Sequence, residues 1–150
     1  VTEQLEEGKQ FFARKYPDMK FLAYFQAYTN TYAELEELKR KYEEALAVKD
    51  VVGLVIGTRP DCMPDALLDY LEELNRRTFL IVEYGIESTD NVTLKRINRG
   101  HSFEVAAEAV RRTASRTYTL TEPASTPLSC SVHLPYRVRC KSHAGPDKYR

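Results

Sequence analysis

Three short apolar runs, each followed by a helical pattern, constrain the fold of this 150-residue chain more than any other feature of its sequence. The runs cover residues 20–29, 51–58 and 78–87, are rich in β-branched and aromatic side chains, and begin about 29 residues apart. Strands that are apolar almost throughout are buried on both faces, as in parallel sheets covered by helices. The repeat therefore predicts parallel βαβ units.

Helices are predicted around these strands from apolar residues spaced three or four apart. They cover residues 32–48, 63–77 and 91–113, and a further helix over 2–16 leads the chain. Asp90 is expected to cap the last of these helices, and Gly100 to interrupt it. The expected fold is of the α/β class, with about three βα units plus a leading helix.

The composition is that of a globular protein, with 43% apolar and 29% charged residues. No apolar run reaches the roughly 20 residues that a membrane span needs. The acidic start lacks the basic and apolar regions of a secretory signal, so we expect a cytoplasmic protein without membrane contact. With 22 basic and 22 acidic residues the formal net charge is zero, which gives no case for a nucleic-acid partner.

This neutrality is the sum of two unlike parts. Residues 1–113 hold 16 basic and 20 acidic residues, a net of −4, whereas residues 114–150 hold 6 basic and 2 acidic residues, a net of +4. Beyond residue 113, Ser, Thr, Pro and Arg are scattered with no helical period. We therefore predict one folded domain over residues 1–113 and an irregular tail over 114–150.

Polar side chains gather where the three predicted strands end, which is the edge at which parallel sheets bind ligands. The ends cover residues 26–31, 57–61 and 83–88. Thr31 as a helix cap and Pro60-Asp61 as a turn would explain some of these residues. Three consecutive ends that carry Gln, Asn, Arg and two Glu are harder to explain by capping alone, because charged groups there must be hydrated or bound.

Two carboxylates and two arginines are the leading chemical candidates. Glu83 and Glu87 lie four apart and, on an extended strand, would share a face as an acid/base pair. The alternative is that at least one of them pairs with Arg59 or Arg99. Arg99 precedes Gly100 at a predicted helix turn, from which its guanidinium can reach over the sheet edge to a carboxylate or phosphate; the alternative is an ordinary solvated arginine.

Other motifs are few. The sequence contains no GxGxxG and no P-loop, which disfavours a nucleotide binder of the doubly wound type. Cys130, His133, Cys140 and His143 are spaced C-x2-H-x6-C-x2-H, which differs from the usual zinc-finger spacing. His101 cannot form a metal site by itself.

Three segments together resemble the radical SAM superfamily: FQAYTNTYA, IGTRPDCMPD and VEYGIESTDNVTLKRINRGHS. The resemblance covers about residues 3–113 and is nearest to uncharacterised bacterial proteins called Fe-S oxidoreductases. The third segment is shared with the elongator catalytic subunit, methylthiotransferases and oxygen-independent coproporphyrinogen oxidase. The family fold is a partial (β/α)6 barrel, so the resemblance implies that this chain forms an incomplete parallel (β/α) barrel.

The resemblance also implies cofactors. In the family, a CxxxCxxC motif holds a [4Fe-4S] cluster, and S-adenosylmethionine (SAM) completes the coordination of the fourth iron. Reductive cleavage of SAM then gives the 5′-deoxyadenosyl radical. SAM is therefore the small-molecule partner that the resemblance implies for this chain.

Roles for residues at the first two strand ends follow from the same resemblance. Gln26, Ala27, Tyr28 and Thr29 correspond to the glycine-rich end of a family strand that receives the SAM amino group, with two of the glycines replaced. Thr58 and Arg59 match a T-R-P-D motif of the elongator subunit, although a glycine precedes them here where that relative has a glutamate.

At the third strand end, Glu87 falls where relatives have Gln or Glu near the SAM ribose, and Ser88 completes the G-[IV]-[QE]-S pattern. Arg99 stands twelve residues after Glu87, as the corresponding arginine does in the porphyrinogen enzyme, and would hold the SAM carboxylate.

Two departures from the family determine the predicted function. CxxxCxxC does not occur in the 150 residues, and no G-L-P-G-E-like segment follows Thr113. We therefore expect an internal fragment of a radical SAM iron–sulfur oxidoreductase that carries part of the SAM pocket, supplies no catalytic or metal-binding residue, and is inactive by itself. Residues 114–150 are expected to be unrelated sequence, with a shifted reading frame as one explanation.

A non-catalytic α/β binding or interaction module is the alternative. Three parallel strands leave two open edges, which favour pairing with another chain. In that case we expect a homo-oligomer that extends the sheet. The sequence identifies no substrate.

Overall fold

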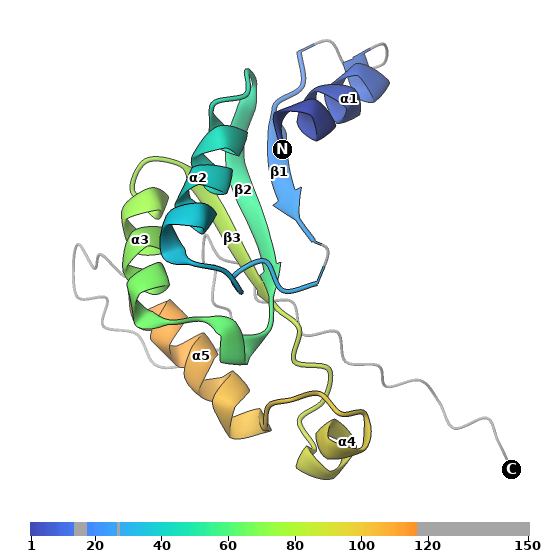
Figure 1. The fold of residues 1–150 in the computed structure, drawn as a ribbon, viewed down its shortest axis with the longest axis vertical. Coiled ribbons are helices and arrows are strands. Elements are labelled where there is room, and N and C mark those ends of the chain that lie inside the picture. The colour runs from blue at the N-terminus through green and yellow to red at the C-terminus, as the bar shows by residue number, and fades with distance from the viewer. Residues whose placement is uncertain (14–17, 27, 117–150) are drawn as a thin grey trace, which may run out of the picture.

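The computed structural model describes residues 1–13, 18–26 and 28–116 (Figure 1). Three strands form one parallel sheet, β1 (Phe21–Phe25), β2 (Val51–Thr58) and β3 (Phe79–Tyr84). The helices are α1 (Thr2–Ala13), α2 (Leu35–Leu46), α3 (Asp65–Asn75), α4 (Asn91–Arg96) and α5 (Phe103–Arg116), and a 3-10 helix, η1 (Pro60–Cys62), follows β2. The predicted α/β class, with three βα units behind a leading helix, is confirmed.

The strands lie in sequence order, β1-β2-β3, and their register aligns the core residues. Ala23, Leu54 and Leu80 are register partners, and each is at most 1% exposed. They belong to one hydrophobic cluster with the buried side chains of α2, α3 and α5. Burial of this aligned row is what fixes the strand register.

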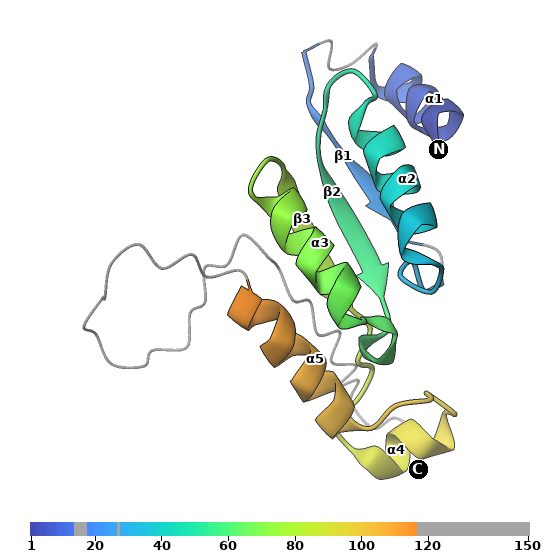
Figure 2. The same cartoon turned by 60° about the vertical axis from the view of Figure 1, so that its left-hand side comes forward.

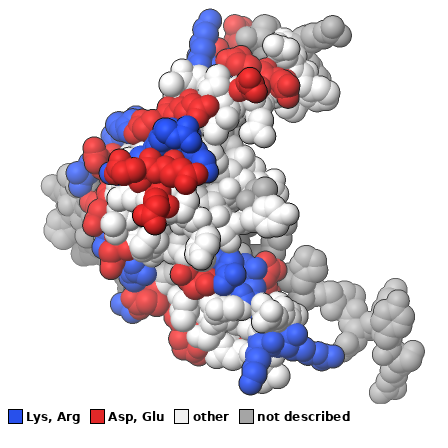
Figure 3. Space-filling view, in the orientation of Figure 1, with Lys and Arg blue, Asp and Glu red and all other residues white. Residues whose placement is uncertain are grey.

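The helices α2, α3 and α5 lie on the same side of the sheet (Figures 1 and 2). The opposite face has no covering helix among the residues that the structure describes, and Leu22 and Phe79 on the sheet are 40% and 46% exposed. Acidic and basic side chains are interspersed over the helical side, whereas the surface below α1 on the side of β1 is largely uncharged (Figure 3).

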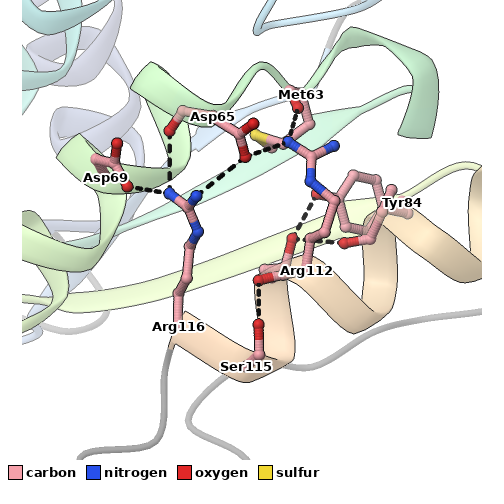
Figure 4. A network of polar contacts seen from close by, with 9 residues as sticks. Met63, Asp65, Asp69, Tyr84, Arg112, Ser115 and Arg116 are labelled. Carbon is pink, nitrogen blue, oxygen red and sulfur yellow. Dashed lines mark hydrogen bonds and ion pairs between the residues drawn. The ribbon is translucent and has the colours of Figure 1, made fainter.

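The helix α5 is held against α3 by ion pairs that cross between the two helices (Figure 4). Arg112 lies 2.7 Å from Asp65, and Arg116 contacts both Asp65, at 3.0 Å, and Asp69. Arg112 also donates to the carbonyl of Met63, at 3.1 Å. The last helix is therefore anchored at the carboxyl end of β2, where η1 leads into α3.

Two local predictions at the last strand are confirmed. Asp90 caps α4 by accepting hydrogen bonds from the backbone of Val92 and Thr93, at 3.2 and 2.9 Å. Gly100 separates α4 from α5 and has a φ of 86°, a left-handed conformation that favours glycine.

The prediction that Thr31 caps a helix is wrong. The N-cap residue of α2 is Glu34, which makes no side-chain cap bond. Thr31 is 3% exposed, and its hydroxyl lies 2.5 Å from that of Thr58 and donates to the carbonyl of Cys62. A buried hydroxyl needs such partners, and these tie the β1 loop to the end of β2.

No helix of the described residues is long and apolar enough to cross a membrane. The predicted tail from residue 117 onward lies outside the described residues, as do Ala27 and the Cys130 to His143 motif.

Candidate functional site: a cavity at the carboxyl end of the sheet

A cavity of about 600 Å³ opens at the carboxyl ends of the three strands. Seven of the eight predicted site residues line it, namely Gln26, Tyr28, Thr29, Thr58, Arg59, Glu87 and Arg99. Gln26, Tyr28 and Thr29 follow β1, Thr58 and Arg59 lie at the end of β2, and Glu87 follows β3. Arg99 reaches the cavity from the loop after α4. The topology thus gathers chain segments that are far apart in the sequence.

The β1 end is shaped by Asn30. Its side-chain amide donates to the carbonyls of Phe25 and Gly57, at 2.9 and 2.8 Å, so it bridges β1 and β2 where both strands end. The hydroxyl of Tyr42 on α2 donates to the carbonyl of Asn30, at 2.7 Å. Tyr28 is 99% exposed and has a φ of 60°, a conformation that aromatic residues rarely adopt and that is enriched at functional sites.

The β2 end presents an arginine that is already paired. Arg59 donates to Asp61 through Nε and Nη2, at 3.0 and 2.5 Å. Burial alone would raise the pKa of Asp61, but hydrogen bonding, with Arg59 as the main donor, outweighs it and lowers that pKa. The guanidinium lies close over Gly100, where a Cβ would stand 2.5 Å from Arg59 Nη2. Arg59 thus connects the end of β2 to the loop that carries Arg99.

Arg99 returns over the end of β3, as the sequence predicts. Its Nη2 donates to the carbonyl of Gly85 and lies 3.8 Å from Glu87 Oε1. A Cβ on Gly85 would stand only 2.7 Å from Nη2, so the glycine leaves room for the guanidinium in the position that it takes here. Its Nε is buried without a hydrogen-bond partner in the described part of the chain. Such an orphaned donor is costly and is common at sites that await a ligand.

Glu83 and Tyr24 form a second polar contact in the cavity. The Tyr24 hydroxyl donates to Glu83 Oε2, at 2.5 Å. The contact spans the sheet from β1 to β3 above β2, where Gly57 is the register partner of Glu83. This short bond is a charge-assisted one, since its acceptor is a carboxylate.

Glu83 and Glu87 do not form the acid/base pair on one strand face that their spacing allowed. The strand β3 ends at Tyr84, and Glu87 has a φ of 69°, so the two carboxylates are not on one extended segment. Both still line the cavity. The alternative, that one of them pairs with an arginine, is confirmed by the contact between Glu87 and Arg99.

Ser88 is not among the residues that line the cavity. Its hydroxyl instead accepts from the backbone of Asp90, at 3.1 Å, and so supports the turn before α4. Six lining residues were not predicted as cofactor-binding: Tyr24, Gly57, Glu83, Tyr84, Gly85 and Ile86. Gly85, the glycine of YGIES, could have indicated this part of the site, because a glycine after a strand often allows another group to approach the backbone closely.

These features define a parallel βα protein whose polar cavity lies at the strand ends. The family model of the radical SAM superfamily matches residues 2–121. The chain belongs to this superfamily.

Relatives with a curated description share the same part of the chain. The uncharacterised protein YtqA of Bacillus subtilis is 48% identical over 112 residues, which are 75% of this chain and 35% of the relative. Protein YhcC of Escherichia coli is 48% identical over 104 residues, 69% of this chain and 33% of the relative. The uncharacterised protein MJ0486 of Methanocaldococcus jannaschii is 41% identical over 112 residues, 74% of this chain and 33% of the relative.

The chain thus spans about a third of the length of the curated relatives that it matches. No solved structure shows significant similarity to it.

The two cofactors of the family differ in how well these residues suit them. The unpartnered Arg99 Nε, and the space that the missing Cβ of Gly85 leaves for the guanidinium, suit a ligand that carries a carboxylate, as SAM does. A [4Fe-4S] cluster needs about four ligands, most of them thiolates. Cys62 is the one cysteine of the described residues, and these residues contain no cluster of three or more His, Cys, Asp or Glu side chains arranged to hold a metal ion. The described residues therefore do not fit the cluster.

Proposed function

We propose that this chain contributes part of the SAM pocket of a radical SAM iron–sulfur oxidoreductase and is inactive by itself. The observation that carries the proposal is that one cavity is lined together by Gln26, Tyr28, Thr29, Thr58, Arg59, Glu87 and Arg99. In this proposal Arg99 binds the SAM carboxylate, the β1 end receives the amino group, and Glu87 faces the ribose.

The state of Arg99 supports its proposed role. Its guanidinium is fixed by the Gly85 carbonyl and only loosely paired with Glu87, at 3.8 Å. It therefore keeps donors for a bidentate carboxylate, and its positive charge is not fully compensated. The guanidinium of Arg59, by contrast, is engaged by both oxygens of Asp61.

Calorimetric titration of the 150-residue chain with SAM tests this proposal. We expect weak but saturable binding, because much of a complete pocket lies beyond these residues. The Arg99→Ala variant should lose at least tenfold in affinity, as a lost charge-assisted hydrogen-bond pair is worth about 1.5–3 kcal/mol. Arg76→Ala is the matched control, since Arg76 pairs with Glu72 on α3, away from the cavity. Equal binding by Arg99→Ala and the wild type would refute the role of Arg99.

Anaerobic reconstitution with iron and sulfide tests the proposed inactivity. We expect no visible charge-transfer absorption from a [4Fe-4S] cluster and no cleavage of SAM by the chain alone. A stable cluster spectrum after desalting would overturn this part of the proposal. Replacing Cys62 by Ser would then show whether that thiol is a ligand.

A second candidate function is a binding module that associates through its sheet. It is favoured by the open sheet face, on which Leu22, Tyr24 and Phe79 are each at least 40% exposed. Exposed apolar patches of this kind mark interaction surfaces or aggregation hazards. Size-exclusion chromatography with light scattering distinguishes an interaction surface from an aggregation hazard. A discrete dimer that melts cooperatively supports the module, and a monomer or a polydisperse aggregate contradicts it.

A further inference from the structure

We propose that Glu83 is the counter-charge of the SAM sulfonium and makes the cavity prefer SAM over its uncharged thioether analogue. This inference rests on the proposed function and adds a specificity residue that the predicted site did not include. It follows from the charges of the cavity, the way Tyr24 holds the carboxylate, and the place of Glu83 among the proposed contacts.

Glu83 is the cavity's one charged side chain without an oppositely charged partner among the described residues. The two lining arginines each have a carboxylate neighbour, Arg59 with Asp61 at 2.5 Å and Arg99, more loosely, with Glu87 at 3.8 Å. Counted with Asp61, these formal charges sum to zero, so the carboxylate of Glu83 leaves the site with a formal net charge of −1. At neutral pH, SAM carries an ammonium, a sulfonium and a carboxylate, a net of about +1 by ordinary pKa values. The ligand and the cavity are therefore complementary in charge.

Tyr24 fixes this carboxylate without neutralising it. Its hydroxyl donates to Oε2 of Glu83, at 2.5 Å, so one oxygen is oriented and the negative charge stays in the cavity. A neutral donor is suited to hold an anion that is to bind a cation, because a lysine or arginine in its place would already compensate the charge. Gly57, the register partner of Glu83 on β2, adds no side chain between the two strands.

The position of Glu83 matches the sulfur rather than the other charged groups of SAM. In SAM, the sulfur joins the amino-acid chain to the ribose. The amino group is proposed for the β1 end, and the ribose for Glu87. Glu83 contacts β1 through Tyr24 and precedes Glu87 by four residues on the β3 side. It therefore lies between the two groups that the sulfur connects.

The experiment compares SAM with S-adenosylhomocysteine, which lacks the sulfonium charge and shares the amino acid, the ribose and the adenine. Dissociation constants for both are measured by calorimetry on the full 150-residue chain at low ionic strength. We expect the wild type to prefer SAM by about tenfold, and Glu83→Gln to reduce this ratio to about twofold or less, since one partly buried ion pair is lost. Raising the salt concentration should lower the ratio for the wild type.

Three further variants make the comparison specific. Tyr24→Phe should reduce the ratio less than Glu83→Gln does, because the charge stays and only its orientation is lost. Glu87→Gln should weaken both ligands by a similar factor and leave the ratio unchanged. Glu72→Gln is the matched control for a Glu to Gln change, since Glu72 lies on α3 and pairs with Arg76.

The outcomes separate this inference from the proposed function. If the wild type binds SAM and Glu83→Gln keeps the wild-type ratio, the role of Glu83 is refuted and the SAM pocket stands. If the wild type binds neither ligand, both proposals are refuted. If Glu83→Gln loses its cooperative thermal transition, the variant no longer tests the inference, and the wild type is used instead. The preference of the wild type for SAM over S-adenosylhomocysteine should then fall as salt is added. A preference that does not change with salt refutes the inference.

Discussion

Gly85 and Arg99 lie in close contact in the cavity, because an added Cβ on Gly85 would lie 2.7 Å from Arg99 Nη2. We predict that Gly85→Ala displaces the guanidinium from the Gly85 carbonyl. Such overpacking typically costs about 1–3 kcal/mol, and here Arg99 can relieve part of it by moving. By calorimetry, the loss of SAM affinity should be similar to that of Arg99→Ala. In thermal unfolding, the loss of stability should be smaller than overpacking usually causes.

Gly8→Ala is the matched control for this substitution. Gly8 lies in α1, and a Cβ there would have no heavy atom within 4 Å. Alanine favours a helix over glycine by about 1 kcal/mol, so the control should melt at the same temperature as the wild type or higher. Unchanged SAM binding by Gly85→Ala would show that the position of Arg99 does not matter for the ligand.

At the scale of elements, α5 depends on Asp65 for its contact with α3. Hydrogen bonding from Arg112 is the main reason that the pKa of Asp65 lies below its usual value, with Arg116 adding to the effect. We predict that Asp65→Asn increases the rate of amide hydrogen exchange in α5 severalfold, because both arginines lose their shared anion. Exposed ion pairs contribute little to global stability, so the thermal transition should move only slightly.

Glu104→Gln serves as the comparison, since its carboxylate accepts from Asn91 near the start of α5 and not from α3. If Glu104→Gln increased amide exchange along the whole of α5 as Asp65→Asn is expected to do, the contact of α5 with α3 would not depend on Asp65 in particular. The pKa of Asp65 is lowered in the fold, so its contribution is present above its unfolded pKa and is lost as the pH falls through the folded value.

The elements also show what the sequence could predict. The apolar run at residues 51–58 coincides with β2, whose middle residues 53–56 are all buried. The run at 20–29 is longer than β1, which ends at Phe25. The side chain of Asn30 takes over the hydrogen bonding there, and Tyr28 has a positive φ. A local hydrophobic pattern contains no information about a side chain that competes with the backbone for hydrogen-bond partners.

The sequence predicted which strand ends meet in the candidate site, because that follows from the topology of a parallel sheet. It did not predict contacts between side chains of different strands, because those depend on the strand register. The rule that ligands bind at the carboxyl ends of parallel strands gathered seven residues correctly into one cavity. The contact between Tyr24 and Glu83 joins residues 59 apart in the sequence, across an intervening strand. It requires the alignment of three strands, which the spacing of single residues does not supply.

For the molecule as a whole, we predict from its buried tyrosines that the folded state becomes less stable at alkaline pH. Burial raises the pKa of Tyr84 to about 12 and also raises those of Tyr42 and Tyr70. In the unfolded chain these groups titrate near 10. A raised folded pKa gives stability that is complete below the unfolded pKa and is lost as the pH rises through the folded one. The free energy of unfolding should therefore fall steeply above pH about 10.

Urea denaturation at a series of pH values checks this, and Tyr84→Phe is the informative variant. Its ring packing is kept, but the hydrogen bond between the Tyr84 hydroxyl and Thr113, at 2.7 Å, is lost. It should lose about 1 kcal/mol at neutral pH and then decline less steeply with pH than the wild type. Equal slopes would mean that Tyr84 does not contribute to the alkaline transition.

The division of the chain near residue 113 stays a prediction at this scale. The helix α5 continues to Arg116, and the family match extends to residue 121. The preference against nucleic acid, drawn from the balanced charge, also stays a prediction.

Each strand of this sheet pairs with the strand before it in the sequence, so the fold can be assembled in the order of synthesis. When the segment up to Thr58 has left the ribosome, β1 and β2 can already pair around α2, and β3 then adds to a formed edge. No strand has to wait for a distant partner, which keeps loop-closure entropy low at every step. The same order leaves β3 as the growing edge, where a nascent chain is open to the next strand or to a neighbouring polypeptide.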